Sequence, residues 1–293
     1  MLMRMHELSP YPASALGEAM TEISKPGARL VCLDVDGTLL GASGVVRDAV
    51  WRAIEQATAA GIRLVMCSGR PGFGVTRELA MRIAPDGWHC FQNGASILHL
   101  AAGRSRSSPL PPETVAMLVS RARTTDRLLE LYSDDDYVTE SDVEVARIHA
   151  GLLGLPFVPR PYDALPPPIV RAQWIVAHDE LDALLGEPHP GLEVSPSLGP
   201  ALPDHVFVNL TRTGVDKGSA VHAVAAEYGV ALSEVMFVGD GFNDTPALRI
   251  VGWPVAMGDA EPAALALARH VVGRVEEDGV AQALEMAVRS VSP

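Results

Sequence analysis

The feature that most constrains the fold is a short apolar run that ends in two aspartates. Residues 30–33 are Leu-Val-Cys-Leu, and Asp34, Asp36, Gly37 and Thr38 follow directly. Four consecutive apolar residues before a turn signal are typical of a strand that is buried on both faces of a parallel sheet. Such α/β sheets bind their ligands at the carboxyl ends of the strands. We therefore predict that both aspartates lie at this edge of an α/β fold.

The two carboxylates indicate either a metal site or an ordinary turn. A loop that begins with Gly37 can bring Asp34 and Asp36 around one small volume, where the carboxylates would repel each other. A hard cation such as Mg²⁺ relieves this repulsion, because it takes oxygen ligands and usually binds one or two carboxylates together with a substrate phosphate. The alternative is a strand followed by an acidic turn, since Asp and Gly are common turn residues. The residues at the ends of the other predicted strands distinguish the metal site from the turn.

A second apolar run, residues 62–67, ends in Ser68-Gly69-Arg70. A serine at this position can donate a hydrogen bond to a phosphate oxygen and can also cap the next helix, whose amino end attracts anions. Capping alone would also explain it. Residues 69–76 have the spacing of a nucleotide-binding P-loop, but Val75 stands where that loop needs its lysine. We therefore reject nucleotide binding by this loop.

A third apolar run, residues 235–238, is followed by Asp240, Asn243 and Asp244. Glycines on both sides of Asp240 permit a tight backbone, so the two carboxylates can turn toward the strand end. Lys217 stands at the start of a predicted helix, where a cation opposes the helix dipole. This local cost suggests a purpose for the lysine, although most lone lysines are simply exposed at the surface.

These motifs together resemble those of a known superfamily. Asp34-Val-Asp36-Gly37-Thr38 resembles the first motif of the haloacid dehalogenase superfamily of phosphohydrolases, and Ser68, Lys217 and residues 239–244 resemble the motifs that follow it in order. Residues 93–94, 255–260 and 277–280 resemble its Cof-type branch, whose members are mostly Mg²⁺-dependent sugar-phosphate phosphatases with a large α/β cap. The resemblance covers nearly everything after residue 27.

The resemblance implies a role for each motif residue. Asp34 would attack phosphorus, Asp36 would handle the proton, and Lys217 would neutralise charge as the third catalytic residue. An aspartate is already ionised at neutral pH and needs no base to become a nucleophile. The remaining groups would bind phosphate (Ser68, Gly69 and Asn243) or Mg²⁺ (Asp34, Asp240, the backbone carbonyl of Asp36, and Asp244, which would complete the site or orient Lys217).

The middle of the chain predicts a second α/β unit. Residues 128–132, 170–176 and 205–210 have strand patterns, and residues 141–152 and 179–185 have helix patterns. We predict a Rossmann-like, doubly wound parallel-sheet core at 1–95 and 211–293, with an inserted α/β cap domain at 96–210.

Three details within the predicted cap can be tested. Ser141 and Glu144 are spaced as a capping box at the start of the predicted helix. Asp134-Asp135-Asp136 invites a metal interpretation, but consecutive side chains rarely converge on one ion, and we expect a solvated loop. Asn209 stands where many members of the resembled family carry glutamate, so no sugar contact can be transferred to it.

Composition limits the compartment and the partners. The chain has 293 residues and no apolar stretch near the roughly 20 residues that span a membrane, and its first residues lack the pattern of a secretory signal. Its three cysteines have no C-x-x-C spacing and fit reduced thiols, so we expect a cytoplasmic protein without a membrane partner. A net charge of -13 argues against nucleic acid.

The sequence thus predicts an Mg²⁺-dependent phosphohydrolase that acts on a small phosphorylated metabolite, with a sugar phosphate as the favoured substrate and an aspartyl-phosphate as the intermediate. One alternative is a phosphohexomutase-like phosphoryl transferase, which uses the same intermediate. A second alternative is a non-catalytic sensor of a phosphorylated metabolite. The intact pair of Asp34 and Asp36 argues against the sensor, because a pure binder needs neither a nucleophile nor its acid.

Overall fold

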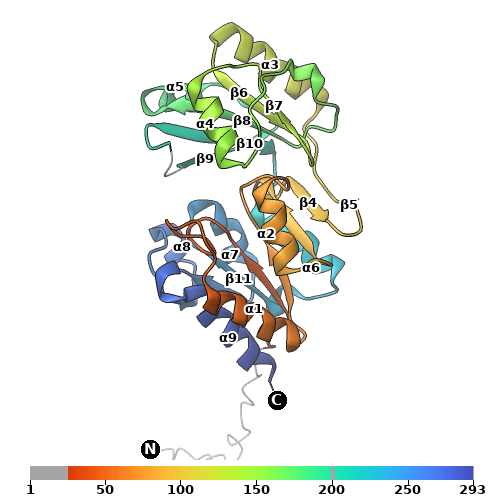
Figure 1. The fold of residues 1–293 in the computed structure, drawn as a ribbon, viewed down its shortest axis with the longest axis vertical. Coiled ribbons are helices and arrows are strands. Elements are labelled where there is room, and N and C mark those ends of the chain that lie inside the picture. The colour runs from red at the N-terminus through yellow and green to blue at the C-terminus, as the bar shows by residue number, and fades with distance from the viewer. Residues whose placement is uncertain (1–25, 199–201, 293) are drawn as a thin grey trace, which may run out of the picture.

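A five-stranded parallel sheet forms the centre of the first of two units in the computed structural model, which describes residues 26–198 and 202–292. Figure 1 shows this unit below the second one. The strand order is β13-β12-β11-β1-β2. The bounds are β1 (Leu30–Leu33), β2 (Arg63–Met66), β11 (Val235–Gly239), β12 (Trp253–Ala256) and β13 (His270–Val271). The three apolar runs that end in polar residues are therefore neighbouring strands.

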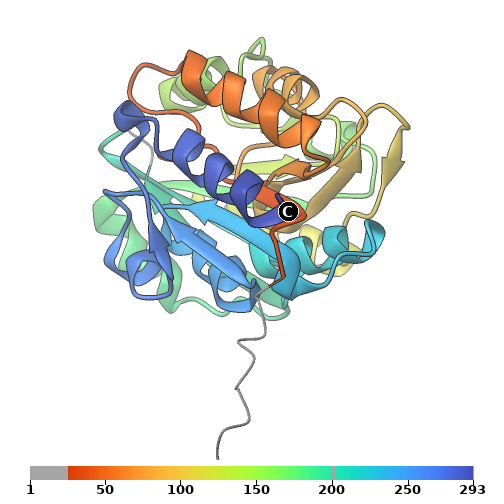
Figure 2. The ribbon, with the colours of Figure 1, turned by 90° about the horizontal axis from the view of Figure 1, so that it is seen from below.

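Helices cover both faces of this sheet. The connection from β1 to β2 contains α1 (Asp48–Ala59), and the connection from β11 to β12 contains α7 (Thr245–Ile250). These crossovers run in opposite directions along the sheet, so right-handed connections place the two helices on opposite faces. Figure 2 shows α1 beside α9 (Gly279–Val291) over one face, and α6 (Lys217–Glu227) packs against α7. This arrangement confirms the predicted doubly wound core.

A small antiparallel sheet extends the first unit beyond residue 95. It consists of β3 (Trp88–Phe91), β4 (Ser96–His99) and β5 (Arg104–Ser105), and it follows α2 (Val75–Ile83) in the chain. The side chains of Ile97, Leu98 and Leu100 join the large apolar core of the parallel sheet. The predicted division of the chain at residues 95 and 211 stays a prediction. Because of this hairpin, we propose that the entry to the second unit lies after Ser105.

The second unit is built on an antiparallel sheet of order β7-β6-β8-β10-β9. Its strands are β6 (Leu128–Tyr132), β7 (Tyr137–Val138), β8 (Arg171–Ala177), β9 (Leu192–Leu198) and β10 (His205–Arg212). Its helices are α3 (Pro112–Thr125), α4 (Glu144–Leu152) and α5 (Leu181–Gly186). Leu118 of α3 and Trp174 of β8 are fully buried in its separate core. The fold is thus a parallel α/β core with an inserted α/β cap, as the sequence predicts.

Two local predictions in the cap have definite outcomes. The capping box is wrong, because α4 begins at Glu144 with Val143 as its N-cap residue and no side-chain cap, and Ser141 lies two residues too early. The acidic run forms no metal site among the described residues. Asp135 is the most solvated of the three, with 84% of its side chain exposed. Asp134 accepts hydrogen bonds from three serine hydroxyls, and Asp136, with 47% of its side chain exposed, pairs with Arg160.

Two further observations concern the whole described chain. Cys32, Cys67 and Cys90 are buried and free, in agreement with reduced core thiols. No helix within 26–198 or 202–292 is long and apolar enough to cross a membrane. Residues 1–25, in which the sequence shows no functional motif, lie outside the described residues.

Candidate active site

The register of the parallel sheet brings three motif segments to one edge. Leu33 at the end of β1 pairs with Met66 of β2 on one side and with Val238 of β11 on the other. The next residues of these strands therefore leave the sheet side by side, since parallel strands end at the same edge. Asp34, the Ser68 loop and Asp240 meet there, although more than 200 residues separate Asp34 from Asp240 in the sequence.

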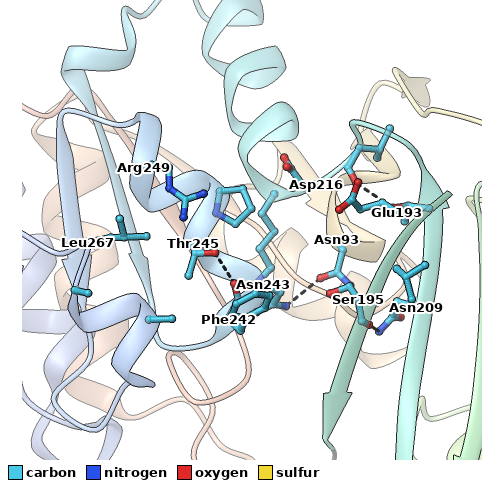
Figure 3. A pocket seen from close by; sticks show the side chains of 17 residues that line it. Asn93, Glu193, Ser195, Asn209, Asp216, Phe242, Asn243, Thr245, Arg249 and Leu267 are labelled. Atoms are coloured by element: carbon cyan, nitrogen blue, oxygen red, sulfur yellow. Dashed lines mark hydrogen bonds between the residues drawn. The ribbon is translucent and has the colours of Figure 1, made fainter. Parts of the chain in front are cut away.

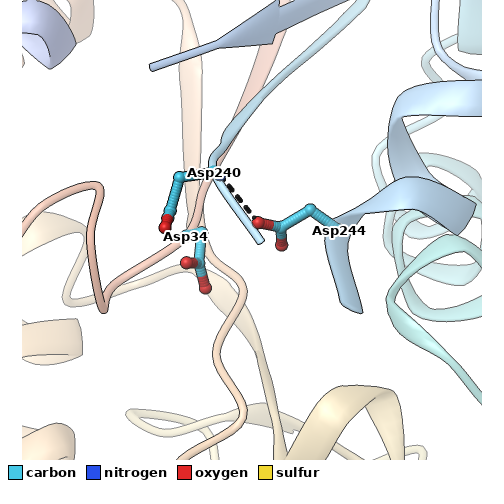
Figure 4. A group of neighbouring side chains, drawn as sticks. All are labelled: Asp34, Asp240 and Asp244. Atoms are coloured by element: carbon cyan, nitrogen blue, oxygen red, sulfur yellow. Dashed lines mark hydrogen bonds between the residues drawn. The ribbon is translucent and has the colours of Figure 1, made fainter. Parts of the chain in front are cut away.

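Three carboxylates converge at this edge (Figure 4). One oxygen from each of Asp34, Asp240 and Asp244 lies within 4.8 Å of the others, and this is the only such acidic group with metal-ligand spacing among the described residues. Asp34 is 5% exposed and Asp244 is completely buried. Buried carboxylates this close need cations nearby, because removing like charges from water is costly.

Lys217 supplies one of these cations. Its Nζ lies 2.5 Å from Asp34 Oδ1 and 2.6 Å from Asp244 Oδ1, and its side chain has no exposed surface. It is the first residue of α6, where Asp216 caps the helix by accepting a hydrogen bond from the Ser219 amide at 2.7 Å. The alternative of an exposed surface lysine is excluded, and the contact with Asp34 explains why a cation stands at a helix start.

The charges in this cluster do not balance. Burial and the neighbouring Asp244 raise the pKa of Asp34 well above its usual range, against the lowering effect of Lys217. Burial also raises the pKa of Asp240 to about 6. The pKa of Lys217 is raised although burial would lower it, because Asp244 and Asp34 stabilise its charged form. Repulsion between the carboxylates adds to the effect of burial on Asp34 and Asp240, because one ammonium does not neutralise three carboxylates.

The donor set fits Mg²⁺. Carboxylate oxygens are the hard ligands that this ion prefers, and Thr38 holds Asp240 in place by donating to its Oδ1 at 2.7 Å. Gly37 has φ +79°, and a Cβ added there would lie 2.2 Å from Asp240 Oδ2, so only glycine lets the loop pass this carboxylate. Both oxygens of Asp244 already accept hydrogen bonds, from Lys217 and from the amides of residues 240 and 241. We therefore propose Asp34 and Asp240 as the better ligands, with Asp244 orienting its neighbours.

Asp36 lies outside the carboxylate cluster. Its carboxylate accepts two hydrogen bonds from the guanidinium of Arg70, at 2.6 and 2.9 Å, and the side chain is 58% exposed. Ser68 is buried and its Oγ accepts a hydrogen bond from the Arg70 amide at 3.0 Å. In this structure the serine hydroxyl thus supports the turn that presents Arg70 to Asp36.

A cavity of about 540 Å³ opens beside the cluster, between the core and the cap (Figure 3). Lys217 and Asn243 line it from the core, and Asn243 donates to the Asn93 side chain at 3.0 Å. Strands β9 and β10 of the cap supply the opposite wall, which includes Glu193 and Asn209. The cavity is large enough for a small metabolite.

Arg171 connects the cap to the predicted phosphate loop, and it was not singled out from the sequence. Its guanidinium donates to the Gly69 carbonyl oxygen at 3.0 Å and to Asn209 Oδ1 at 2.7 Å, and it lies 4.0 Å from the centre of the Tyr132 ring. The side chain is buried and forms no ion pair among the described residues, although it interacts electrostatically with the buried carboxylate of Glu130. An arginine in a strand whose only other polar residue is Gln173 was the one available signal.

Comparison with known proteins decides the family. The family model of haloacid dehalogenase-like hydrolases matches residues 31–152 and 203–284, which is more than half of the chain. The chain belongs to the haloacid dehalogenase-like hydrolases. This confirms the predicted superfamily and the prediction that the chain is an enzyme.

Similar members of the haloacid dehalogenase-like hydrolases cover most of this chain. The pyridoxal phosphate phosphatase YbhA of Escherichia coli is 28% identical over 266 residues, which cover 87% of this chain and 96% of the relative. The HMP-PP phosphatase of Cronobacter sakazakii is 24% identical over 267 residues, with 88% and 94% covered.

Solved structures of the haloacid dehalogenase-like hydrolases agree with the fold. A haloacid dehalogenase-like hydrolase from Bacteroides thetaiotaomicron has a TM-score of 0.77 at 25% identity, covering 88% of this chain and 98% of that one. A subclass IIB sugar phosphatase of the superfamily has a TM-score of 0.75 at 22% identity over the same shares, which supports the fold alone. These neighbours confirm a parallel-sheet core with a cap domain.

Proposed function

We propose that this haloacid dehalogenase-like hydrolase is an Mg²⁺-dependent phosphatase that releases phosphate from a small phosphorylated metabolite, with a sugar phosphate as the favoured substrate. The observation that carries the proposal is the buried contact of Lys217 with both Asp34 and Asp244, 2.5 and 2.6 Å away, beside a third carboxylate. The proposed nucleophile and the carboxylates that would hold the metal stand together around Lys217, which lines a metabolite-sized cavity. The relatives named as phosphatases support the same reaction.

In this mechanism Asp34 attacks the phosphorus atom and forms an aspartyl-phosphate. Phosphoryl transfer depends mainly on positioning and on neutralising the phosphoryl oxygens. Lys217 holds the carboxylate of Asp34 in place and contributes a positive charge next to it. Ser68 and Asn243 are the predicted neutral donors to the phosphate, and Gly69 is the predicted backbone donor. A bound Mg²⁺, held by Asp34 and Asp240, would supply further positive charge to neutralise the transferring group.

Asp36 is the proposed acid and base. It would protonate the leaving oxygen and then deprotonate the water that hydrolyses the aspartyl-phosphate, which is a contribution of about 10²- to 10⁴-fold. To reach the leaving group its carboxyl has to separate from Arg70, which holds it at 2.6 Å in this structure. The backbone carbonyl of Asp36 as a metal ligand stays part of the proposal.

The cellular compartment and the binding partner are also proposals. Three free, buried cysteines fit a reducing compartment, so we propose a cytoplasmic location. The net charge of -13 supports a small phosphorylated metabolite over nucleic acid as the partner.

The decisive experiment measures inorganic phosphate released from a panel of phosphorylated sugars and cofactors, with Mg²⁺ and with a chelator. We expect Mg²⁺-dependent release by the wild type, none by Asp34→Asn, and wild-type rates for Asp135→Asn, a matched exposed aspartate. Rearrangement of a phosphosugar without phosphate release would favour the mutase. Failure of the wild type to transform any substrate would overturn the phosphatase and favour the sensor.

A further inference from the structure

Phe242 is exposed at a position where exposure needs a reason. Phe242 is 62% exposed, and it is the only aromatic residue among the large apolar residues that are exposed in the described chain. It begins the short helical turn Phe242–Asp244, directly before Asn243, and it lines the cavity beside Lys217 (Figure 3). No ring of the described residues stacks on it. Its apolar face is available to whatever enters the cavity.

Both walls of the cavity combine apolar and polar groups around Phe242. On the core side, Leu267 adds apolar surface and Arg249 adds a charged group. On the cap side, Val194 is apolar and Glu193 is charged. A ligand that fits this cavity needs an apolar face for Phe242 and polar groups at its edge.

We propose that Phe242 is a specificity-determining residue whose ring packs against the flat face of a ring in the alcohol part of the substrate. The substrate class is then a phosphate monoester of a cyclic alcohol, in preference to an acyclic one. This inference rests on the proposed function, since it assigns the phosphate to the Lys217 end of the cavity. The C–H face of a sugar ring and the π-face of a heteroaromatic ring share the required chemistry, because both are flat and apolar.

The geometry supports contact with the leaving group and not with the phosphate. Lys217 is 1% exposed and marks the inner end of the cavity, whereas Phe242 is exposed and offers no hydrogen-bond donor. Asn243, the next residue, donates to the Asn93 side chain. The exposed Phe242 is therefore next to the predicted phosphate donor, and we place the alcohol portion of a bound ester against it.

The test compares three esters that all carry phosphate on a primary alcohol: pyridoxal 5′-phosphate, glucose 6-phosphate and glycerol 3-phosphate. The quantity measured is the ratio of kcat/KM for each cyclic ester to that for glycerol 3-phosphate. Loss of one aromatic stacking partner lowers such a ratio by roughly tenfold to a hundredfold. We expect this loss in Phe242→Ala for at least one cyclic ester, and a retained ratio in Phe242→Tyr. Val45→Ala, which changes an exposed apolar residue elsewhere, is the matched control.

The two cyclic esters identify the ring. If only the kcat/KM ratio for glucose 6-phosphate falls in Phe242→Ala, the ring that Phe242 contacts is a sugar. If only the ratio for pyridoxal 5′-phosphate falls, it is a heteroaromatic ring. Equal losses for all three esters, or a wild type without preference for either cyclic ester, would overturn the inference.

Binding separates this inference from the proposed function. The affinities of the three esters for Asp34→Asn, measured by calorimetry with and without the added Phe242→Ala change, report ring recognition without turnover. A cyclic preference that depends on Phe242 supports the inference even where the wild type releases no phosphate. Equal affinities for cyclic and acyclic esters would refute it even where phosphate release is rapid.

Discussion

Replacing Lys217 by methionine should destabilise the protein strongly. The methionine keeps most of the apolar stem of the lysine but leaves Asp34 and Asp244 buried without their shared cation. With Nζ–O distances of 2.5 and 2.6 Å and an effective dielectric constant of about 20, each pair attracts by about 6–7 kcal/mol. Desolvation of the three ions costs several kcal/mol each and offsets most of this gain.

The net loss for Lys217→Met is therefore about 3–5 kcal/mol in the free energy of unfolding at pH 7. The loss should shrink as the pH falls, because burial already raises the pKa of Asp34, and its protonated form no longer needs a cation. Adding Asp34→Asn to the variant should recover part of the stability, since it removes one of the two unpaired charges.

The assay is urea unfolding followed by circular dichroism in the presence of a chelator, at pH 7 and at pH 5. Arg52→Met, which removes one positive charge from an exposed position of α1, is the matched control and should change stability by less than about 0.5 kcal/mol. A loss below about 1 kcal/mol for Lys217→Met, or no recovery in the double variant, would show that the carboxylates do not depend on this lysine.

Three further predictions concern other contacts. Burial lowers the pKa of His89 to about 4. The stability that comes from its neutral form is therefore complete above about pH 6.5 and is lost as the pH falls toward 4. Between pH 7.5 and 5, urea unfolding should show that the wild type loses about 2 kcal/mol more of its unfolding free energy than His89→Gln does. Thr38→Val removes the hydrogen bond that orients Asp240 and should weaken Mg²⁺ binding by about 10- to 100-fold, as measured by calorimetry; unchanged affinity would contradict that role. Arg171→Met leaves two acceptors without their donor and should lower the unfolding free energy by about 1–3 kcal/mol, whereas a neutral effect would mean that the buried cation costs as much as its contacts contribute.

The sequence predicted the core well because each element there has a local signal. An apolar run of four residues is buried on both faces, and the polar residues after it have to lie at the strand end. Asp34, Ser68 and Asp240 therefore could be placed at one edge without knowledge of the strand order. The family resemblance implied a catalytic role for Lys217, but its contact with Asp34 was not predicted, since 183 residues separate the two.

The cap was less predictable because its contacts are long-range. The spacing of Ser141 and Glu144 is a valid capping signal, but the chain enters α4 two residues later than that signal requires. Asp134 looks like a solvated acid in sequence, yet it accepts hydrogen bonds from Ser96, Ser105 and Ser107 of a hairpin that the sequence did not reveal. Local patterns cannot show which distant hydroxyls will meet a carboxylate.

The charge balance of the site explains why these particular residues occur together. When all three carboxylates are ionised, they exceed the one ammonium by two negative charges, and at neutral pH Asp240 remains mostly ionised despite its raised pKa of about 6. A divalent cation restores neutrality, whereas a monovalent one does not. A phosphate dianion can approach Asp34 only after that charge has been neutralised, because two anions at contact distance repel strongly in a buried site. We therefore expect substrate binding to depend on the metal that these carboxylates would hold.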